Sequence, residues 1–396
     1  MSAASYVLYA PATGQVLAEK SDGLRLMPAS TTKIMTALVV LQHIHDLGRM
    51  VRITAAEAYV QGSSAPMRPG EELSVRDLLY GLLLVSGNNA AVALANATAG
   101  SVPRFVTMMN VEARALGATR THFDDPNGLP VATHLTTALD LARIAAAALR
   151  EPEFVRILHT KVLERYPMPN GPPQPMVNQD QLLWTYPGII GGKIGYTIQA
   201  GNTMVAIARR HGLTLIAVVL HDVPWAYFGD ESNLLTYGFD TYRQATLVPA
   251  GLAVSQRAVA GAPGRTDTLE TVDPVTWAVA GSGSVHVRTH LIAPLRLPAG
   301  QPRGAVVGSL AVYASGQLAG TVPVALAQAT PSPPAPARSP WGGFVARLGL
   351  GLVLLFLAWR TAVSLRAPAA RRAKPRRRRY RVRRDSVWMR MAGGDR

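Results

Sequence analysis

The stretch PASTTKIMTALV (residues 28–39) decides how this chain folds, because it joins a polar turn to a run of apolar residues. Ser30 is an acceptable N-cap, so we predict that a buried helix opens at this serine. The i, i+3 spacing then places the hydroxyl of Ser30 and the amine of Lys33 on one face. Serine becomes a nucleophile when a nearby base takes its proton, and a lysine serves as that base where burial or a neighbouring cation lowers its pKa. Taken alone, the pattern equally fits a capped helix with a solvated lysine.

A second motif, Ser86-Gly87-Asn88, lies in LLLVSGNNAAVALA (residues 82–95), at a break between two apolar helices predicted over 78–85 and 90–97. A hydroxyl and a carboxamide are costly at such a place unless they are paired. Ser86 and Asn88 are therefore predicted to line a cleft. The alternative is helix punctuation, with the asparagine as a cap.

A third motif, GGKIGYTIQAG (residues 191–201), is predicted to be a strand that precedes a hairpin of residues 203–208 and 213–220. On an edge strand, Lys193 followed by small residues presents a cation and backbone N–H groups to an anionic substrate. By itself, this lysine is equally an ordinary strand residue.

The order of elements predicts an α+β domain over residues 1–245, because strands lie at both ends with helices between them. A hairpin is expected at 5–9 and 15–19, and helices at 136–149 and 231–242. From 246 to 328, short alternating stretches separated by Gly, Pro and Ser predict a small all-β domain.

The C-terminal part of the sequence predicts a membrane anchor. Residues 329–340 are a Pro-rich linker, and the next 19 residues carry one charge, with a tryptophan at each end. We predict a transmembrane helix at 341–360, with a buried core helix as the alternative. The basic tail, 361–396, is predicted to stay in the cytoplasm, so the rest of the chain faces outside the cell membrane. The N-terminus lacks the pattern of a secretory signal, although this topology requires export.

Charge and composition exclude several classes of site. Residues 366–396 hold thirteen lysines and arginines against two aspartates, so most of the net charge of +16 belongs to the tail beside the predicted membrane span, and nucleic-acid binding is not predicted. The chain has no cysteine, and its two histidine pairs, His43 with His45 and His286 with His290, lack the placement or the carboxylates of a metal site. No glycine loop for a phosphate is present. We therefore predict neither a metal nor a cofactor.

Together the three motifs, Ser-x-x-Lys, Ser-x-Asn and an altered Lys-Thr-Gly, occur in the order found in penicillin-binding proteins. With THFDDPNGL (residues 121–129) and AGNT (residues 200–203), the chain resembles the low-molecular-mass D-alanyl-D-alanine carboxypeptidases over residues 4–245. The resemblance implies a β-lactamase/transpeptidase-like sheet-and-helix domain, and the all-β domain looks, more loosely, like the second domain of that family. It also implies a serine D,D-carboxypeptidase that acts on peptidoglycan stem peptides and reacts covalently with β-lactam antibiotics.

The resemblance also implies roles for individual residues. Ser30 would be the acylated nucleophile and Lys33 its general base, while Ser86 would relay protons and Asn88 would hold the substrate amide. Lys193 would meet the terminal carboxylate of the substrate. The other implied substrate-binding residues are Gly195, Tyr196 and Thr197, and the backbone N–H groups of Ser30 and Tyr196 would form the oxyanion hole.

Ile194 departs from the family, which has a threonine there whose hydroxyl is thought to bind the substrate carboxylate. An isoleucine cannot donate that hydrogen bond. The departure implies a lower activity or a different substrate, such as a cross-linked peptide. The alternatives are therefore a D,D-endopeptidase or a β-lactamase with the same site, or a non-catalytic peptidoglycan-binding relative weakened at Ile194.

Overall fold

The computed structural model describes residues 1–168, 171–281, 283–332 and 342–364, and in the last range it describes side chains at 349–361. The chain divides into two units, Met1–Pro333 and Pro334–Arg396.

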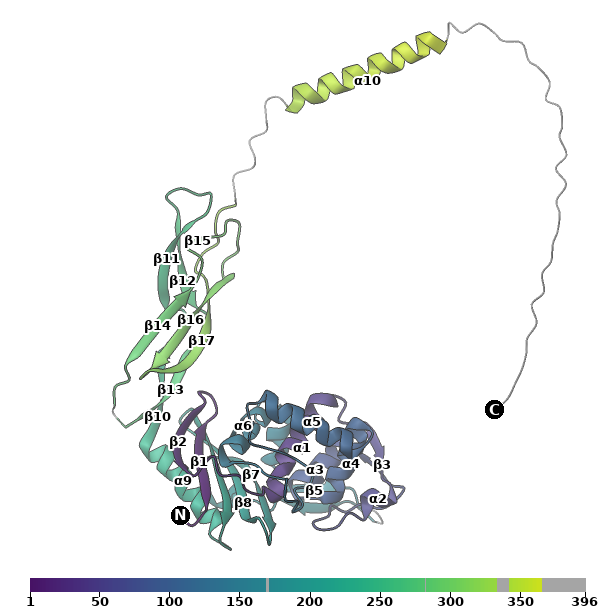
Figure 1. The fold of residues 1–396 in the computed structure, drawn as a ribbon, viewed down its shortest axis with the longest axis vertical. Coiled ribbons are helices and arrows are strands. Elements are labelled where there is room, and N and C mark those ends of the chain that lie inside the picture. Colours follow the sequence, from purple (N-terminus) through teal and green to yellow (C-terminus); the bar gives the residue numbers. More distant parts are fainter. Residues whose placement is uncertain (169–170, 282, 333–341, 365–396) are drawn as a thin grey trace, which may run out of the picture. The chain divides into compact units, whose positions relative to one another are not determined.

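A five-stranded antiparallel sheet forms the centre of the first part of the chain (Figure 1). Its strand order is β2-β1-β9-β8-β7, so the strand with the Lys193 motif lies at an open edge. Both predicted hairpins are confirmed, as β1 with β2 and β8 with β9. The strands are β1 (Ser5–Ala10), β2 (Gln15–Lys20), β7 (Ile189–Thr197), β8 (Gly201–Arg210) and β9 (Leu213–Asp222).

Helices cover both faces of this sheet, because its central strands are apolar on both sides. Val205 and Ile207 of β8 join the core under the main group of helices, whereas Met204 and Ala206 join the core under α8 and α9. The mixed helix-and-sheet class predicted from the sequence is thereby confirmed. The helices are α1 (Lys33–His43), α2 (Ala55–Ala58), α3 (Val75–Leu83), α4 (Asn88–Ala99), α5 (Val102–Ala115), α6 (Ala138–Ala148), α7 (Pro152–Leu158), α8 (Leu182–Thr185) and α9 (Tyr227–Thr241).

The start of α1 differs from the prediction. Ser30 lies in a short 3-10 helix, η1 (Ala29–Thr32), and α1 begins only at Lys33. Ala29 has φ 48°, and the N-cap of α1, Thr32, makes no capping hydrogen bond. The predicted N-cap role of Ser30 is therefore wrong, because its hydroxyl lies against the amine of Lys33 instead of a backbone N–H.

Short strand pairs flank the helices, namely β3 (Met50–Arg52) with β4 (Glu72–Ser74) and β5 (Val162–Tyr166) with β6 (Gln174–Val177). Between α9 and residue 326 the described chain forms strands β10 to β17 and no helix. This region contains a two-stranded sheet and a six-stranded sheet ordered β14-β16-β17-β12-β11-β15 around a core that includes Leu269, Trp277 and Val312. These strands are β10 (Tyr242–Val248), β11 (Ala253–Val259), β12 (Thr266–Thr271), β13 (Val275–Ala280), β14 (Val287–Ile292), β15 (Arg296–Leu297), β16 (Val306–Ala314) and β17 (Gln317–Leu326).

The second unit contains α10 (Gly342–Ser364), which overlaps the membrane span predicted at 341–360. Among the described residues, the structure has no helix with both the length and the apolar character needed to cross a membrane. Two predicted segments lie mostly outside the described residues. These are the linker 329–340, which is described only up to residue 332, and the tail 361–396, which is described only up to residue 364.

Candidate active site

Ser30 and Lys33 lie at the centre of the site, where η1 meets α1. The Nζ atom of Lys33 is 2.8 Å from the Oγ atom of Ser30. It also donates to Oδ1 of Asn88 and to the backbone carbonyl of Asn127, each at 2.8 Å. Two N–H groups of a neutral amine satisfy these two carbonyl oxygens, which leaves its lone pair for the proton of Ser30.

The surroundings of Lys33 favour that neutral amine. Its side chain is fully buried. Burial lowers the pKa of Lys33 well below its usual value, the positive charge of Lys193 lowers it further, and the carboxylate of Asp125 opposes the shift. A lysine in this state can act as a general base toward the serine beside it.

Ser86 and Asn88 reach the site from the break between α3 and α4. Ser86 is buried and holds a positive φ of 63°, which is a strained conformation for a residue other than glycine. Its Oγ makes no hydrogen bond within the described part of the chain, and it lines the same cavity as Ser30. Asn88 bridges Lys33 and the carbonyl of Gln61, to which its Nδ2 donates at 2.7 Å. Ser86 therefore lines a cavity, with a hydroxyl available for hydrogen bonding, whereas the buried Asn88 is not among the residues that line it.

Edge strand β7 forms the opposite wall. Gly195 packs against η1 so closely that a Cβ atom there would lie 2.5 Å from Oγ1 of Thr203 and 2.7 Å from the backbone nitrogen of Ser30. Ile194 and the exposed Tyr196 line the cavity beside Ser30. Thr197 does not line it: its Oγ1 accepts a hydrogen bond from the backbone N–H of Ala200 and so holds the turn into β8.

Lys193 is buried behind this wall, and its Nζ donates to the carbonyl of Ile194 at 2.8 Å. Burial lowers the pKa of Lys193 to about 7, while the carboxylate of Asp180 opposes this shift. Burial also raises the pKa of Asp180 to about 6, and one of its carboxylate oxygens makes no hydrogen bond in the described chain. The structure therefore places Lys193 beside the site, where its charge lowers the pKa of Lys33.

The sequence did not reveal the role of Asp125, which holds the turn whose carbonyl, at Asn127, accepts a hydrogen bond from Lys33. Oδ1 of Asp125 accepts hydrogen bonds from the backbone N–H groups of Asn127 and Gly128, at 2.6 and 2.7 Å. These bonds close a turn that directs the carbonyl of Asn127 at the amine of Lys33. Gly128 has φ 88°, and a Cβ there would lie 1.7 Å from the carbonyl oxygen of Ala29. The Asp-Pro-Asn-Gly sequence is a recognisable turn signal, but it does not tell which side chain the turn contacts.

The cavity at Ser30 has a volume of about 190 Å³ and is lined by Ser30, Ser63, Ser86, Gln179, Ile194, Gly195, Tyr196, Asn202 and Tyr227. Ser63, Gln179, Asn202 and Tyr227 were not singled out from the sequence. Ser63 and Gln179 lie in loops, Asn202 lies in β8 within the AGNT stretch, and Tyr227 begins α9. This arrangement, a serine beside a buried lysine in a cavity bordered by an edge strand, can carry out acyl transfer through a serine ester.

The part of the chain that carries this site matches a known protein family. Residues 1–223, more than half of the chain, match the family described as D-alanyl-D-alanine carboxypeptidase. The chain belongs to this family of serine peptidases. The family and the hydrolase class predicted from the sequence are thereby confirmed.

Individual members of the family are similar over most of their length. The D-alanyl-D-alanine carboxypeptidase DacB2 of Mycobacterium tuberculosis is 39% identical over 241 residues, which are 59% of this chain and 81% of that protein. DacF of Bacillus subtilis is 31% identical over 82% of this chain and 84% of its own. The crystal structure of penicillin-binding protein 5 from Haemophilus influenzae has a TM-score of 0.69 and 27% identity, and covers 84% of this chain and 98% of its own. The similarity to the last two proteins extends beyond the first 245 residues, into the β region.

The fit of Gly195 against η1 leads to a prediction. We expect Gly195→Ala to lower the rate of acylation of Ser30 by about tenfold or more, because the added Cβ must push β7 away from the Ser30 nitrogen. The rate is measured with benzylpenicillin. Gly229→Ala is the matched control, since a Cβ at Gly229 on α9 meets no atom within 4 Å. Equal rates for Gly195→Ala and the wild type would show that the close approach of β7 is not needed.

Proposed function

We propose that this chain is a serine D,D-carboxypeptidase that removes the terminal D-alanine from peptidoglycan stem peptides through an acyl-enzyme on Ser30. The observation that carries the proposal is the 2.8 Å contact between Oγ of Ser30 and the fully buried Nζ of Lys33. Membership of the D-alanyl-D-alanine carboxypeptidase family supports the choice of substrate.

In the proposed reaction, the neutral amine of Lys33 takes the hydroxyl proton of Ser30 as Oγ attacks the carbonyl carbon of the penultimate D-alanine. The negative charge that develops on the carbonyl oxygen is stabilised by the backbone N–H groups of Ser30 and Tyr196. The C–N bond then breaks, and the departing amine receives the proton that Lys33 took from Ser30, relayed through Ser86. Water, deprotonated by Lys33, attacks the ester and regenerates the serine.

The substrate is held by the two walls of the cavity. Asn88 would bind the amide of the stem peptide, and β7, as an open edge strand, would pair with its backbone. The positive charge of Lys193 would attract an anionic substrate from behind the wall. A β-lactam antibiotic would react with Ser30 in the same way and remain attached as an ester.

Intact-mass analysis after incubation with benzylpenicillin, together with an assay for released D-alanine, tests the proposal. A stable adduct on Ser30 and release of D-alanine from a peptide ending in D-Ala-D-Ala are the expected results. Rapid turnover of the antibiotic would indicate a β-lactamase instead. Absence of both adduct and release would indicate a non-catalytic peptidoglycan-binding relative.

We also propose that the peptidase works outside the cytoplasmic membrane, to which the apolar segment 341–360 anchors it, with the basic tail inside. Support comes from the sequence, in which thirteen lysines and arginines follow that segment, and from the extracellular location of peptidoglycan.

This topology predicts the result of adding protease to intact protoplasts. We expect digestion of residues 1–340 and protection of an epitope placed at the C-terminus, because only the tail would lie behind the membrane. The two regions are followed by immunoblot, with detergent-permeabilised protoplasts as the control in which both are digested. Protection of the peptidase region in intact protoplasts would contradict the proposal.

A further inference from the structure

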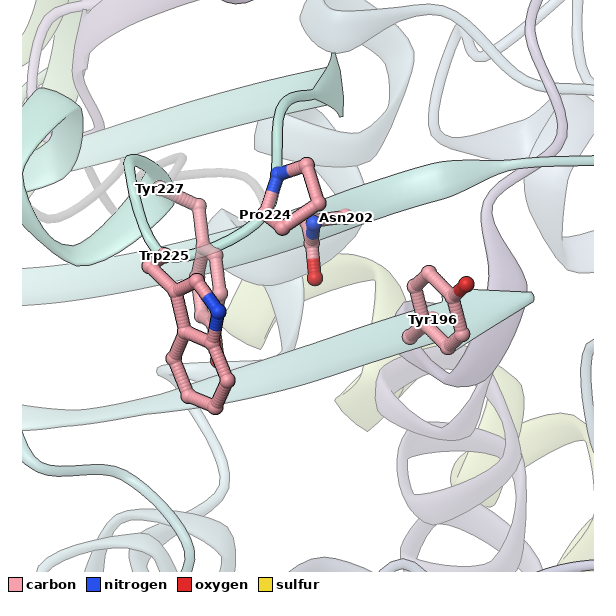
Figure 2. Close-up of a pocket in the computed structure, with 5 residues that line it drawn as sticks. All are labelled: Tyr196, Asn202, Pro224, Trp225 and Tyr227. Atoms are coloured by element: carbon pink, nitrogen blue, oxygen red, sulfur yellow. The ribbon is translucent and has the colours of Figure 1, made fainter. Parts of the chain in front are cut away.

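A second cavity adjoins the one at Ser30. It has a volume of about 310 Å³ and is lined by Tyr196, Asn202, Pro224, Trp225 and Tyr227 (Figure 2). Three of these residues, Tyr196, Asn202 and Tyr227, also line the cavity at Ser30, and we call these three the shared wall. The proposed reaction gives no role to their side chains.

The proposed reaction also leaves one group of the substrate without a direct partner. The terminal carboxylate belongs to the D-alanine that leaves, and its carbon is two covalent bonds, about 2.5 Å, from the nitrogen of the bond that breaks. It therefore lies in or next to the cavity at Ser30. None of the described residues that line either cavity carries a charge, and the amine of Lys193 is buried and donates to the carbonyl of Ile194. The cavity thus offers the carboxylate only uncharged side-chain donors.

The side chains of the shared wall differ in what they can donate. Nδ2 of Asn202 donates to the carbonyl of Asp222, and Figure 2 shows its Oδ1, an acceptor, pointing into the space beside Trp225. The hydroxyl of Tyr196 points away from Trp225 and Tyr227 in the same view. The hydroxyl of Tyr227 makes no hydrogen bond within the described residues. Tyr227 is therefore the residue of the shared wall with a donor free for a ligand.

The other donors of the cavity at Ser30 suit the carboxylate less well. The hydroxyl of Ser86 relays a proton in the proposed reaction. Ser63 and Gln179 are exposed, whereas Tyr227 is half-buried. A hydrogen bond to a charged group is stronger where water is partly excluded, so the hydroxyl of Tyr227 is favoured over these two exposed side chains.

The position of Tyr227 is fixed by the turn between β9 and α9. Tyr227 is the first residue of α9, and its ring lies 4.4 Å from that of Phe228 between centroids. In the turn before it, Trp225 has φ 65°, which a bulky residue rarely adopts, and the N–H of Ala226 donates to the carbonyl of Val223. Strained backbone of this kind is found where a fold holds a side chain for a function.

Tyr227 also remains a donor at neutral pH. Burial raises the pKa of Tyr227, and the carboxylate of Asp180 raises it further. The hydroxyl therefore keeps its proton. An O–H group that donates to a carboxylate forms a short, charge-assisted hydrogen bond, which is stronger than one to a neutral acceptor.

We propose that the hydroxyl of Tyr227 donates a hydrogen bond to the terminal carboxylate of the leaving D-alanine and thereby selects substrates with a free carboxyl end. It supplies a contact that the side chain of Ile194, which lines the same cavity, cannot make. The bond that breaks and the acyl-enzyme on Ser30 are those of the proposed function, on which this inference rests.

Two peptides that differ in one group test the selection: diacetyl-L-Lys-D-Ala-D-Ala and the same peptide ending in D-alaninamide. We expect the wild type to have a kcat/KM about tenfold or more higher for the acid. Tyr227→Phe removes only the hydroxyl and should lower kcat/KM for the acid about ten- to hundredfold, the effect of one hydrogen bond to a charged group. It should lower that for the amide severalfold at most, because a neutral acceptor gains less from the hydroxyl.

Tyr237→Phe is the matched control, because Tyr237 is a half-exposed tyrosine on the same helix that lines neither cavity. It should leave both rates within about twofold of the wild type. An equal loss on both peptides in Tyr227→Phe, or no loss on the acid, would overturn the inference while leaving the peptidase function standing. If the wild type cleaves neither peptide although Ser30 reacts with benzylpenicillin, the proposed function fails, and the inference fails with it.

Discussion

Ser30→Ala should remove covalent labelling by benzylpenicillin completely and lower the release of D-alanine by about a thousandfold or more. No ester can form without the Oγ atom, and in the structure no other hydroxyl lies within hydrogen-bond distance of the Lys33 amine among the described residues. Labelling is measured by intact mass and D-alanine release by an amino-acid oxidase assay. The fold should be retained, because Ser30 caps no helix.

Ser63→Ala is the matched control, since Ser63 lines the same cavity but is exposed, and within the described residues only its backbone carbonyl has a partner, the N–H of Asn88. It should label at a rate close to that of the wild type. An adduct that persists in Ser30→Ala, or that disappears in Ser63→Ala, would show that the nucleophile has been assigned to the wrong serine.

Lys33→Arg should lower the rate of acylation of Ser30 by about a hundred- to ten-thousandfold, the usual contribution of a general base. An arginine carries a positive charge and hydrogen-bond donors but does not lose its proton in proteins. Lys33 is predicted to act in its neutral form, because burial and Lys193 lower its pKa well below the usual value. The second-order rate constant for benzylpenicillin is the measurement.

A larger side chain in a fully buried position can also disturb the fold, so Lys33→Gln is made in parallel. Gln is uncharged and smaller than Arg, and it should lose as much activity. Thermal unfolding of both variants shows whether the domain remains folded. If Lys33→Arg retains acylation within about tenfold of the wild type while Lys33→Gln does not, Lys33 acts through its charge and not as a base.

How much of the site the sequence predicts differs from residue to residue. Ser30 and Lys33 are three positions apart, and any helical turn at that point brings their side chains together. Their pairing was therefore predictable, even though the turn is a 3-10 helix and α1 begins three residues after Ser30. That β7 precedes the hairpin of β8 and β9 was predictable as well, but its place at an edge of the sheet was decided by the tertiary structure.

Asp180 could not be found in this way. It lies 13 residues before Lys193, and only the fold buries the two side chains close enough for each to shift the pKa of the other. Local patterns report secondary structure and turns, but not which buried charges face each other.

The sequence by itself determined the family, the order of the three motifs, the apolar strands of the central sheet and the pair Ser30 and Lys33, because these depend on residues close together in the chain. The tertiary structure alone decided that Asn88 and the carbonyl of Asn127, 55 and 94 residues from Lys33, complete the surroundings of its amine. It also placed Trp225 and Tyr196 around one cavity. The physical reason is that such contacts depend on how sheet and helices pack, and the hydrophobic pattern that drives packing specifies which faces are buried but not which polar atoms meet.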